Sequence, residues 1–180
     1  MANIIAGIGS RETPFGIMEQ MMEVGNWCRQ RQVYLRSGHA PGADQAFEKG
    51  AQEYCIAYLP WLSFEVESFN GMTHYKVPSD WDLLIHHAKQ YHPYWKKLSQ
   101  GAQKLMARNS AQVLGLTLKS PVKAVVCWTR DGGASGGTGQ AIRIANANQI
   151  PVLNMHSQSY CIAALVIQEL YQLFGDTIPK

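Results

Sequence analysis

This sequence of 180 residues has no long hydrophobic run and no block of like charges. No apolar stretch approaches the roughly 20 residues that a membrane-spanning helix needs, so we expect no membrane partner. The start of the chain lacks the basic segment, apolar core and cleavage site of a signal peptide, which favours a cytoplasmic location. Charged residues make up only 16% of the chain, and the net charge of +3 is spread along it. The absence of a basic track argues against nucleic acid as the partner.

Paired cysteines are also missing. Cys28, Cys55, Cys127 and Cys161 lie far apart in the sequence and form no CxxC motif. Each has apolar neighbours, so we expect buried free thiols, in keeping with a reducing cytoplasm. The histidines between residues 86 and 92 show no metal-ligand spacing. Nothing in the sequence predicts a metal or a cofactor.

Strand and helix patterns alternate along most of the chain. Short apolar runs predict strands, and apolar residues recurring every three or four positions predict amphipathic helices. The strands are expected at residues 2–6, 33–36, 55–59, 124–128 and 150–155, and the helices at about 14–31, 45–54, 94–116, 139–148 and 157–174. Residues 62–93 lose both patterns and contain Gly71 and Pro78, so we expect an irregular insertion there.

This alternation predicts a parallel sheet, because parallel neighbours need a crossover connection. We therefore expect a single α/β domain over residues 1–180 with a Rossmann-like three-layer fold. Helices would cover both faces of a central, mainly parallel sheet of about five strands. Ligands of such sheets bind beyond the carboxyl ends of the strands, where the strand order reverses. Three glycine-rich loops lie at those ends.

The first loop, residues 7–13, joins an apolar strand to a helix. Its glycines let backbone amides approach an anion at the positive end of the helix. We take Gly9, Ser10 and Arg11 as candidate ligand-binding residues, since the arginine can bind phosphate through two hydrogen bonds. The alternative is a tight turn with a solvated arginine, because a short glycine-rich turn is weakly specific.

The second loop follows the next strand. Its candidate ligand-binding residues are Ser37, Gly38, Gly42, Ala43 and Asp44. In the alternative interpretation the loop is only a turn, and Asp44 caps the following helix. His39 could act as an acid or base in this loop, although a lone loop histidine is more often solvated.

The third loop, residues 132–139, has five glycines and opens directly into a helix, as an anion-binding nest does. A structural turn seldom needs so many glycines, because each costs conformational entropy. We expect Ser135, Gly136, Gly137 and Thr138 to bind phosphate. None of the three loops has the GxxxxGK[ST] spacing of a P-loop, and the first does not fit GxGxxG with an acidic residue about 20 positions on. An NTPase site and a standard NAD site are therefore disfavoured.

Two further kinds of residue are candidates for the same site. Arg108 and Asn109 lie within the helix expected at 94–116, where a core-directed guanidinium would need an anionic partner and a surface arginine is the plainer interpretation. Trp61 and Trp128 follow or end strands and could stack on a base. Packing in the core or at its rim explains both tryptophans equally well.

Taken together, these motifs resemble the SLOG superfamily. The matching segments are GIGSRETP at 7–14, SGHAPGADQAFEKGA at 37–51, the pair Pro60-Trp61, ARNSAQVLG at 107–115 and SGGTGQAIRIANANQIPV at 135–152. SLOG is the Rossmann-like group that includes the Smf/DprA proteins and the LOG, or "lonely guy", phosphoribohydrolases, and the likeness extends to YspA-related proteins. The resemblance implies a pocket for a nucleotide or nucleotide derivative around Ser10, Arg11, residues 42–44, Arg108 and residues 136–138.

The resemblance to LOG enzymes breaks at one position. Their third loop reads PGGxGTxxE, and its Glu acts with a helix arginine to cleave the N-glycosidic bond between a base and ribose 5-phosphate. We match Arg108 to that arginine. Aligning Gly137 and Thr138 with the GT pair, however, places Ala141 where the Glu should be. The carboxylate that would stabilise an oxocarbenium-like transition state is therefore missing from its expected place.

Two function classes remain open. In the first, the protein holds a nucleotide-derived ligand unchanged, as a sensor or sequestering protein. In the second, it is a glycosidase or other nucleotide hydrolase with Arg108 and Asp44 as catalytic residues, or with Asp131 or Glu12 as the source of the carboxylate. Single-stranded DNA binding, as in Smf/DprA proteins, ranks third. The low charge and the apolar closing helix also predict a homo-oligomer.

Overall fold

The computed structural model describes residues 3–175. Within them lie the strands β1 (Ile4–Gly9), β2 (Tyr34–Ser37), β3 (Cys55–Tyr58), β4 (His74–Lys76), β5 (Val125–Trp128) and β6 (Val152–Asn154). The α-helices are α1 (Phe15–Gln30), α2 (Ala43–Ala51), α3 (Trp81–Lys89), α4 (Gln100–Leu114), α5 (Gly136–Ala147) and α6 (Ala163–Phe174). Short 3₁₀ turns occur at Gln52–Tyr54, Val66–Ser68 and Trp95–Lys97.

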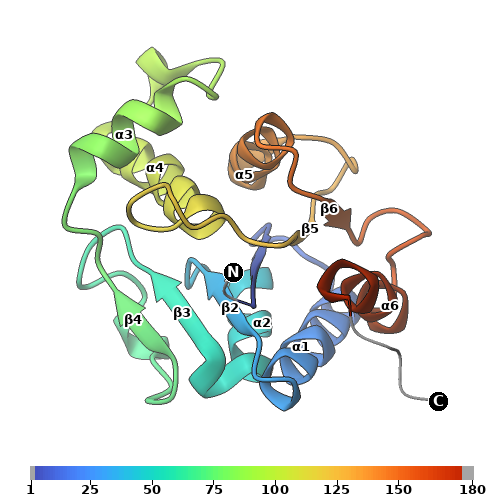
Figure 1. Cartoon of the computed structure of the whole chain (residues 1–180). Coiled ribbons are helices and arrows are strands. Elements are labelled where there is room, and N and C mark those ends of the chain that lie inside the picture. Colours follow the sequence, from blue (N-terminus) through green and yellow to red (C-terminus); the bar gives the residue numbers. More distant parts are fainter. Residues whose placement is uncertain (1–2, 176–180) are drawn as a thin grey trace.

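All six strands form one parallel sheet in the order β4-β3-β2-β1-β5-β6. Helices α1, α2 and α6 cover one face, and α3, α4 and α5 cover the other (Figure 1). The three-layer, Rossmann-like α/β fold expected from the sequence is thus confirmed. The sheet has six strands rather than about five, because β4 lies inside the segment predicted to be irregular.

The 62–93 segment contains both β4 and α3. β4 escapes sequence analysis because it is a three-residue edge strand whose side chains are exposed or half-buried, so it shows no apolar alternation. α3 begins after Asp80, whose carboxylate accepts a hydrogen bond from the Leu83 amide at 2.9 Å.

Two predicted helices begin later than expected. The helix predicted from residue 94 starts only at Gln100, because the Ser99 hydroxyl caps it by accepting from the Ala102 amide at 3.3 Å. The closing helix starts at Ala163 rather than at 157, and the residues before it form turns. Apolar spacing does not encode such boundaries, and α6 begins without a side-chain cap.

Helix α6 closes the core on its face of the sheet. Val166 and Leu170 are fully buried, and the Trp27 and Tyr171 rings meet edge to face at 5.5 Å. Much of the apolar stripe that suggested an oligomer is therefore used inside the protein. Ile162 and Leu165 remain 46% and 36% exposed. The homo-oligomer stays a prediction.

Three of the cysteines are buried free thiols, as expected, whereas Cys161 is only half-buried. Burial raises the pKa of the Cys127 thiol to about 12 and also raises the pKa values of Cys28 and Cys55. These three thiols are therefore poor nucleophiles. No helix within residues 3–175 is both long and apolar enough to cross a membrane.

The order of strands creates a crevice between β1 and β5. From β1 the chain moves outward through β2, β3 and β4, and the remaining strands, β5 and β6, lie on the other side of β1. The loops after β1 and β5 consequently diverge at the carboxyl edge of the sheet. This is the place at which ligands bind in open parallel sheets.

Helices α1 and α2 approach each other at backbone distance. A Cβ atom on Gly50 would stand 2.1 Å from the Met22 carbonyl oxygen, and one on Gly25 would stand 2.5 Å from the Phe47 carbonyl oxygen. Such contacts are too short for any side chain. Glycine is therefore required at both positions, and the close approach fixes α2, with the loop that precedes it, against α1.

We expect Gly50→Ala to lower the free energy of unfolding by about 2–3 kcal/mol, because the added methyl forces the two helices apart. Gly16→Ala is the matched control. Gly16 also lies in α1, but a methyl added there would meet no atom within 4 Å, so alanine should be neutral or stabilise by up to about 1 kcal/mol. Urea denaturation of the three proteins measures the difference, and equal stabilities would contradict the close approach.

Candidate functional site

A cleft of about 550 Å³ lies at the carboxyl ends of β1 and β5, beside α4 and the start of α5. The predicted residues that line it are Gly9, Ser10, Arg11, Asp44, Arg108, Asn109, Ser135, Gly136, Gly137 and Thr138. The remaining candidates, Ser37, Gly38, Gly42, Ala43 and Trp61, lie outside the lining. The structure thus brings the first loop, the third loop and the helix arginine together, while most of the second loop lies behind them.

The third loop presents the amino end of α5 to the cleft. Ser135 is the N-cap residue of α5, but its hydroxyl donates to Asp131 Oδ1 at 2.7 Å and makes no capping bond. Among residues 3–175, no acceptor pairs with the amides of residues 136–138. Three N–H groups at the positive end of a helix dipole are therefore available to an anion.

Side chains from α4 and α5 hold this loop in place. Asn109 Nδ2 donates to the Gly137 carbonyl at 3.1 Å. Arg143 donates from Nη1 to the Ala134 carbonyl at 2.9 Å and from Nε to the Tyr91 carbonyl at 2.6 Å. Gln140 Nε2 donates to the Ala88 carbonyl at 2.7 Å. The 62–93 segment, through α3 and the turn after it, thus supports the cleft without lining it.

Asp44 joins the first and second loops. Its Oδ1 accepts from the Gly9 amide at 3.1 Å and its Oδ2 from the Ala40 amide at 3.3 Å. The alternative interpretation, in which Asp44 caps the helix, is wrong, because Gly42 is the N-cap of α2 and the Asp44 carboxylate accepts from amides that precede the helix. Burial raises the pKa of the Asp44 carboxyl to about 6, against the opposing effect of the Arg108 charge.

Arg108 is buried, so the surface interpretation is wrong. Its side chain fits against Gly38, where a Cβ would stand 2.8 Å from the guanidinium carbon, and Nη1 donates to the Gly38 carbonyl. The guanidinium lies 5.2 Å from the centre of the Phe64 ring. Burial lowers the pKa of Arg108, and the nearby charge of Asp44 opposes that change.

The Arg108 charge is incompletely compensated. Its Nε has no hydrogen-bond partner, and no carboxylate in the described part of the chain lies within ion-pair distance of it. Asp44, the nearby acid, already uses both oxygens on backbone amides. A buried cation in this state is costly, and an anion bound in the cleft would offset the cost.

Two exposed arginines stand at the edge of the cleft, and each faces a carboxylate. Arg11 Nη2 lies 3.9 Å from Glu65 Oε1, and Arg130 Nη2 lies 2.6 Å from Glu12 Oε2. Arg130 was missed in the sequence, although its place two residues after a strand end is a signal that could have found it. The cleft residues Leu105 and Met106 were also missed, because apolar residues in a helix carry no functional signal.

The carboxylates that a hydrolase would need are all engaged. Ala141 is fully buried in the apolar cluster between β5 and α5, so the position of the LOG Glu does not reach the cleft. Asp131 accepts from the Ser135 hydroxyl and, at 3.0 Å, from the Gly133 amide. Asp44 and Glu12 are held as described above. Of these three acids, Asp44 and Glu12 line the cleft and Asp131 does not.

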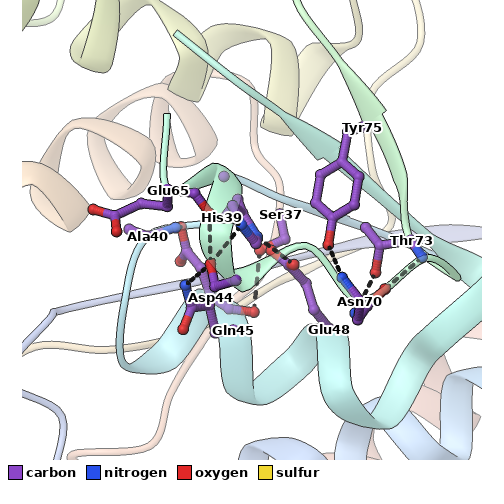
Figure 2. A network of polar contacts seen from close by, with 12 residues as sticks. Ser37, His39, Ala40, Asp44, Gln45, Glu48, Glu65, Asn70, Thr73 and Tyr75 are labelled. Atoms are coloured by element: carbon purple, nitrogen blue, oxygen red, sulfur yellow. Dashed lines mark hydrogen bonds and ion pairs between the residues drawn. The ribbon is translucent and has the colours of Figure 1, made fainter. Parts of the chain in front are cut away.

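His39 is buried rather than solvated, and it lies outside the cleft lining. Figure 2 shows its ring between Glu48 on α2 and the backbone of Glu65. Nδ1 lies 2.7 Å from Glu48 Oε2, and Nε2 lies 3.1 Å from the Glu65 carbonyl oxygen. The rings of Phe69 and Tyr75 meet it edge-on at 5.0 and 4.8 Å. His39 thus attaches the segment after β3 to α2.

The His39–Glu48 pair should make stability depend on pH. Burial alone would lower the pKa of His39, but the hydrogen bond and the charge of Glu48 raise it overall. The pair's contribution is therefore complete below the ordinary histidine pKa of about 6.5 and is lost as the pH rises through the higher pKa of the folded state.

We expect His39→Gln to lower the free energy of unfolding by about 3 kcal/mol at pH 6, because it leaves Glu48 buried without a cation. The difference from the unsubstituted protein should shrink at pH 9. Guanidinium denaturation of both proteins at both pH values measures this difference in the free energy of unfolding. The other histidines titrate in both proteins, so their contribution drops out of the difference. A difference that is the same at pH 6 and pH 9 would contradict a charged pair.

No family model matches this sequence, and no curated protein matches it. Solved structures do match. The molybdenum cofactor carrier protein of Chlamydomonas reinhardtii aligns over 96% of this chain and 99% of its own, with a TM-score of 0.63 and 15% identity. A second structure described as the Moco carrier protein of this alga gives a TM-score of 0.60 over 98% of this chain and 99% of its own, again at 15% identity.

DNA processing protein A of Helicobacter pylori is a third match. It aligns over 98% of this chain and 75% of its own, with a TM-score of 0.59 and 15% identity, and is described for its mode of binding single-stranded DNA. These neighbours are SLOG-type Rossmann-like proteins. The fold that the motifs implied is therefore confirmed, whereas the finer likeness to LOG and YspA-related proteins stays a prediction.

Proposed function

We propose that the cleft binds a nucleotide or nucleotide-derived ligand through its phosphate group and holds it unchanged, as a sensor or sequestering protein. The proposal depends mainly on the unpaired hydrogen-bond donors of the cleft. The amides of residues 136–138 lack acceptors within the described chain, and the Arg108 side chain lines the same cleft with no described carboxylate at ion-pair distance. A phosphate supplies several strong acceptor oxygens and negative charge, which suits such a site.

Arg11 and Arg108 both line the cleft, and their positive charges are close enough to interact. The charge of Arg11 contributes to the lowered pKa of Arg108, so the two guanidinium groups repel each other. An anion between them would relieve that repulsion, and the helix dipole of α5 would add to the attraction. The apolar side chains of Leu105 and Met106 then provide a surface for a flat or hydrophobic part of the ligand.

Holding the ligand is favoured over cleaving it, because every candidate carboxylate already has a partner. The Moco carrier proteins with this fold agree with a binding role, since their names describe carriage. An N-glycosidase or hydrolase that uses Arg108 and Asp44 remains the alternative. Single-stranded DNA, which the Helicobacter protein binds, is a second alternative.

A ligand panel separates these three functions. The purified protein is incubated with mono-, di- and cyclic nucleotides, NAD, ADP-ribose and a single-stranded oligonucleotide, and each mixture is followed by thermal shift and chromatography. At a concentration 100 times its Kd, the ligand should raise the melting temperature by about 5 to 10 °C and be recovered intact. Release of free base would establish the hydrolase instead, and a response to the oligonucleotide alone would support DNA binding.

Arg108→Met should weaken binding of the best ligand about tenfold to a hundredfold, the value of a charged hydrogen bond. Arg36→Met is the control. Arg36 is equally buried but lies outside the cleft, and it donates to the Ser120 carbonyl at 2.7 Å and to the Ser120 hydroxyl at 3.1 Å. That variant should lose stability and keep its affinity. If Arg108→Met instead loses stability and keeps affinity, the arginine is structural.

A further inference from the structure

Glu65 lies in the segment that follows β3, and its carboxylate faces Arg11 at the edge of the cleft. Among the described residues, no other acid from that segment pairs with an arginine of the cleft. Glu12 and Asp44 belong to the first and second loops, whereas Glu65 precedes the 3₁₀ turn at Val66–Ser68. Its carboxylate lies 3.9 Å from the Arg11 guanidinium, and the two side chains are 35% and 57% exposed. Nothing in the chemistry of the proposed site requires an acid there, since a carboxylate repels phosphate.

The backbone of Glu65 is held firmly in this position. Its φ angle of 49° lies in the left-handed region, which is unfavourable for a residue other than glycine. Three donors fix its carbonyl oxygen: His39 Nε2 at 3.1 Å, the Ser68 amide at 3.0 Å and the Ser68 hydroxyl at 2.7 Å. Gln45 Nε2 in turn donates to the Ser68 hydroxyl at 2.9 Å.

The side chain of Glu65, by contrast, takes no part in that network. Figure 2 shows its carboxylate pointing away from His39 and from the bonds that hold its backbone. Its contact with Arg11 is long and partly solvated, and such an ion pair contributes little to stability. The residue therefore combines a firmly held backbone with a carboxylate whose ion pair with Arg11 is weak.

This arrangement deepens the proposed function and rests on it: we propose that Glu65 is a built-in competitor for the ligand anion at Arg11. In the absence of ligand, its carboxylate neutralises Arg11. A phosphate, which carries more charge and more acceptor oxygens than a carboxylate, displaces it, and the Glu65 side chain rotates into solvent while the backbone stays in place. Weakly charged or neutral molecules fail to displace it, so Glu65 makes the cleft selective for strongly anionic ligands.

The test measures affinity for inorganic pyrophosphate and for ADP by calorimetry at low ionic strength. Glu65→Gln should raise the association constant for both probes about twofold to fivefold, the range expected when an exposed ion pair is removed as a competitor. Glu67→Gln is the matched control, because it removes the same charge two residues away at an exposed site. It should leave the affinity unchanged. In an Arg11→Gln background, Glu65→Gln should no longer raise the affinity.

The outcomes distinguish this inference from the proposed function. Binding by the unsubstituted protein with no gain in Glu65→Gln, or with the same gain in Glu67→Gln, would overturn the competitor and leave the phosphate site standing. Weaker ADP binding in Glu65→Gln would show that Glu65 contacts the ligand, which also overturns it. Failure of both the unsubstituted protein and Glu65→Gln to bind either probe would reject the phosphate site, and the competitor with it. Binding only by Glu65→Gln would support both.

Discussion

The close approach of β1, α1 and α2 is the constraint on which the cleft depends. It continues beyond the contact between the two helices into the strand itself. A Cβ on Gly7 would stand 2.6 Å from the Phe47 ring, and one on Gly9 would stand 2.3 Å from the Ala43 methyl group. Side chains larger than hydrogen would push α2 away from β1. Because α2 lies so close, its second residue, Asp44, reaches the amide at the end of β1.

The hydrogen bond between the Gly9 amide and Asp44 makes the shape of the cleft depend on how closely α2 packs against β1. Asp44 accepts from Gly9 and Ala40 with its two oxygens, which sets the end of the first strand relative to the loop after the second. Gly42 allows the same approach on the other side, because a Cβ there would stand 2.8 Å from the Ser10 carbonyl oxygen. The second loop is thus mainly a support for the first. The opposite wall is fixed differently, by long side chains of α4 and α5 that donate to backbone carbonyls and leave the amides at the start of α5 unpaired.

The sequence predicted the parts of this site that depend on backbone chemistry. The ordered motifs implied the fold that the structure confirms, and the glycine-rich third loop does leave the amides of residues 136–138 unpaired, whereas the Gly9 amide of the first loop donates to Asp44. It could not predict which loop residues face the cleft, because Gly38 and Gly42 look no different in the sequence from Gly136 and Gly137, yet neither lines the cleft. It also missed β4, whose exposed side chains show no alternation, and the buried state of Arg108, which depends on the space left by Gly38.

The segment after β3 shows why such tertiary features matter for function. His39 was the natural candidate for an acid or base, since it lies in a loop at the carboxyl edge of the sheet. The structure instead places it against Glu48 and beside the stacked rings of Phe69 and Tyr75, where it holds the backbone of Glu65. His39 therefore has a structural role. It affects the cleft only indirectly, through its hydrogen bond with the Glu65 carbonyl oxygen. A segment with no recognisable pattern in the sequence thereby supplies the carboxylate nearest to Arg11 and so adjusts the charge of the cleft.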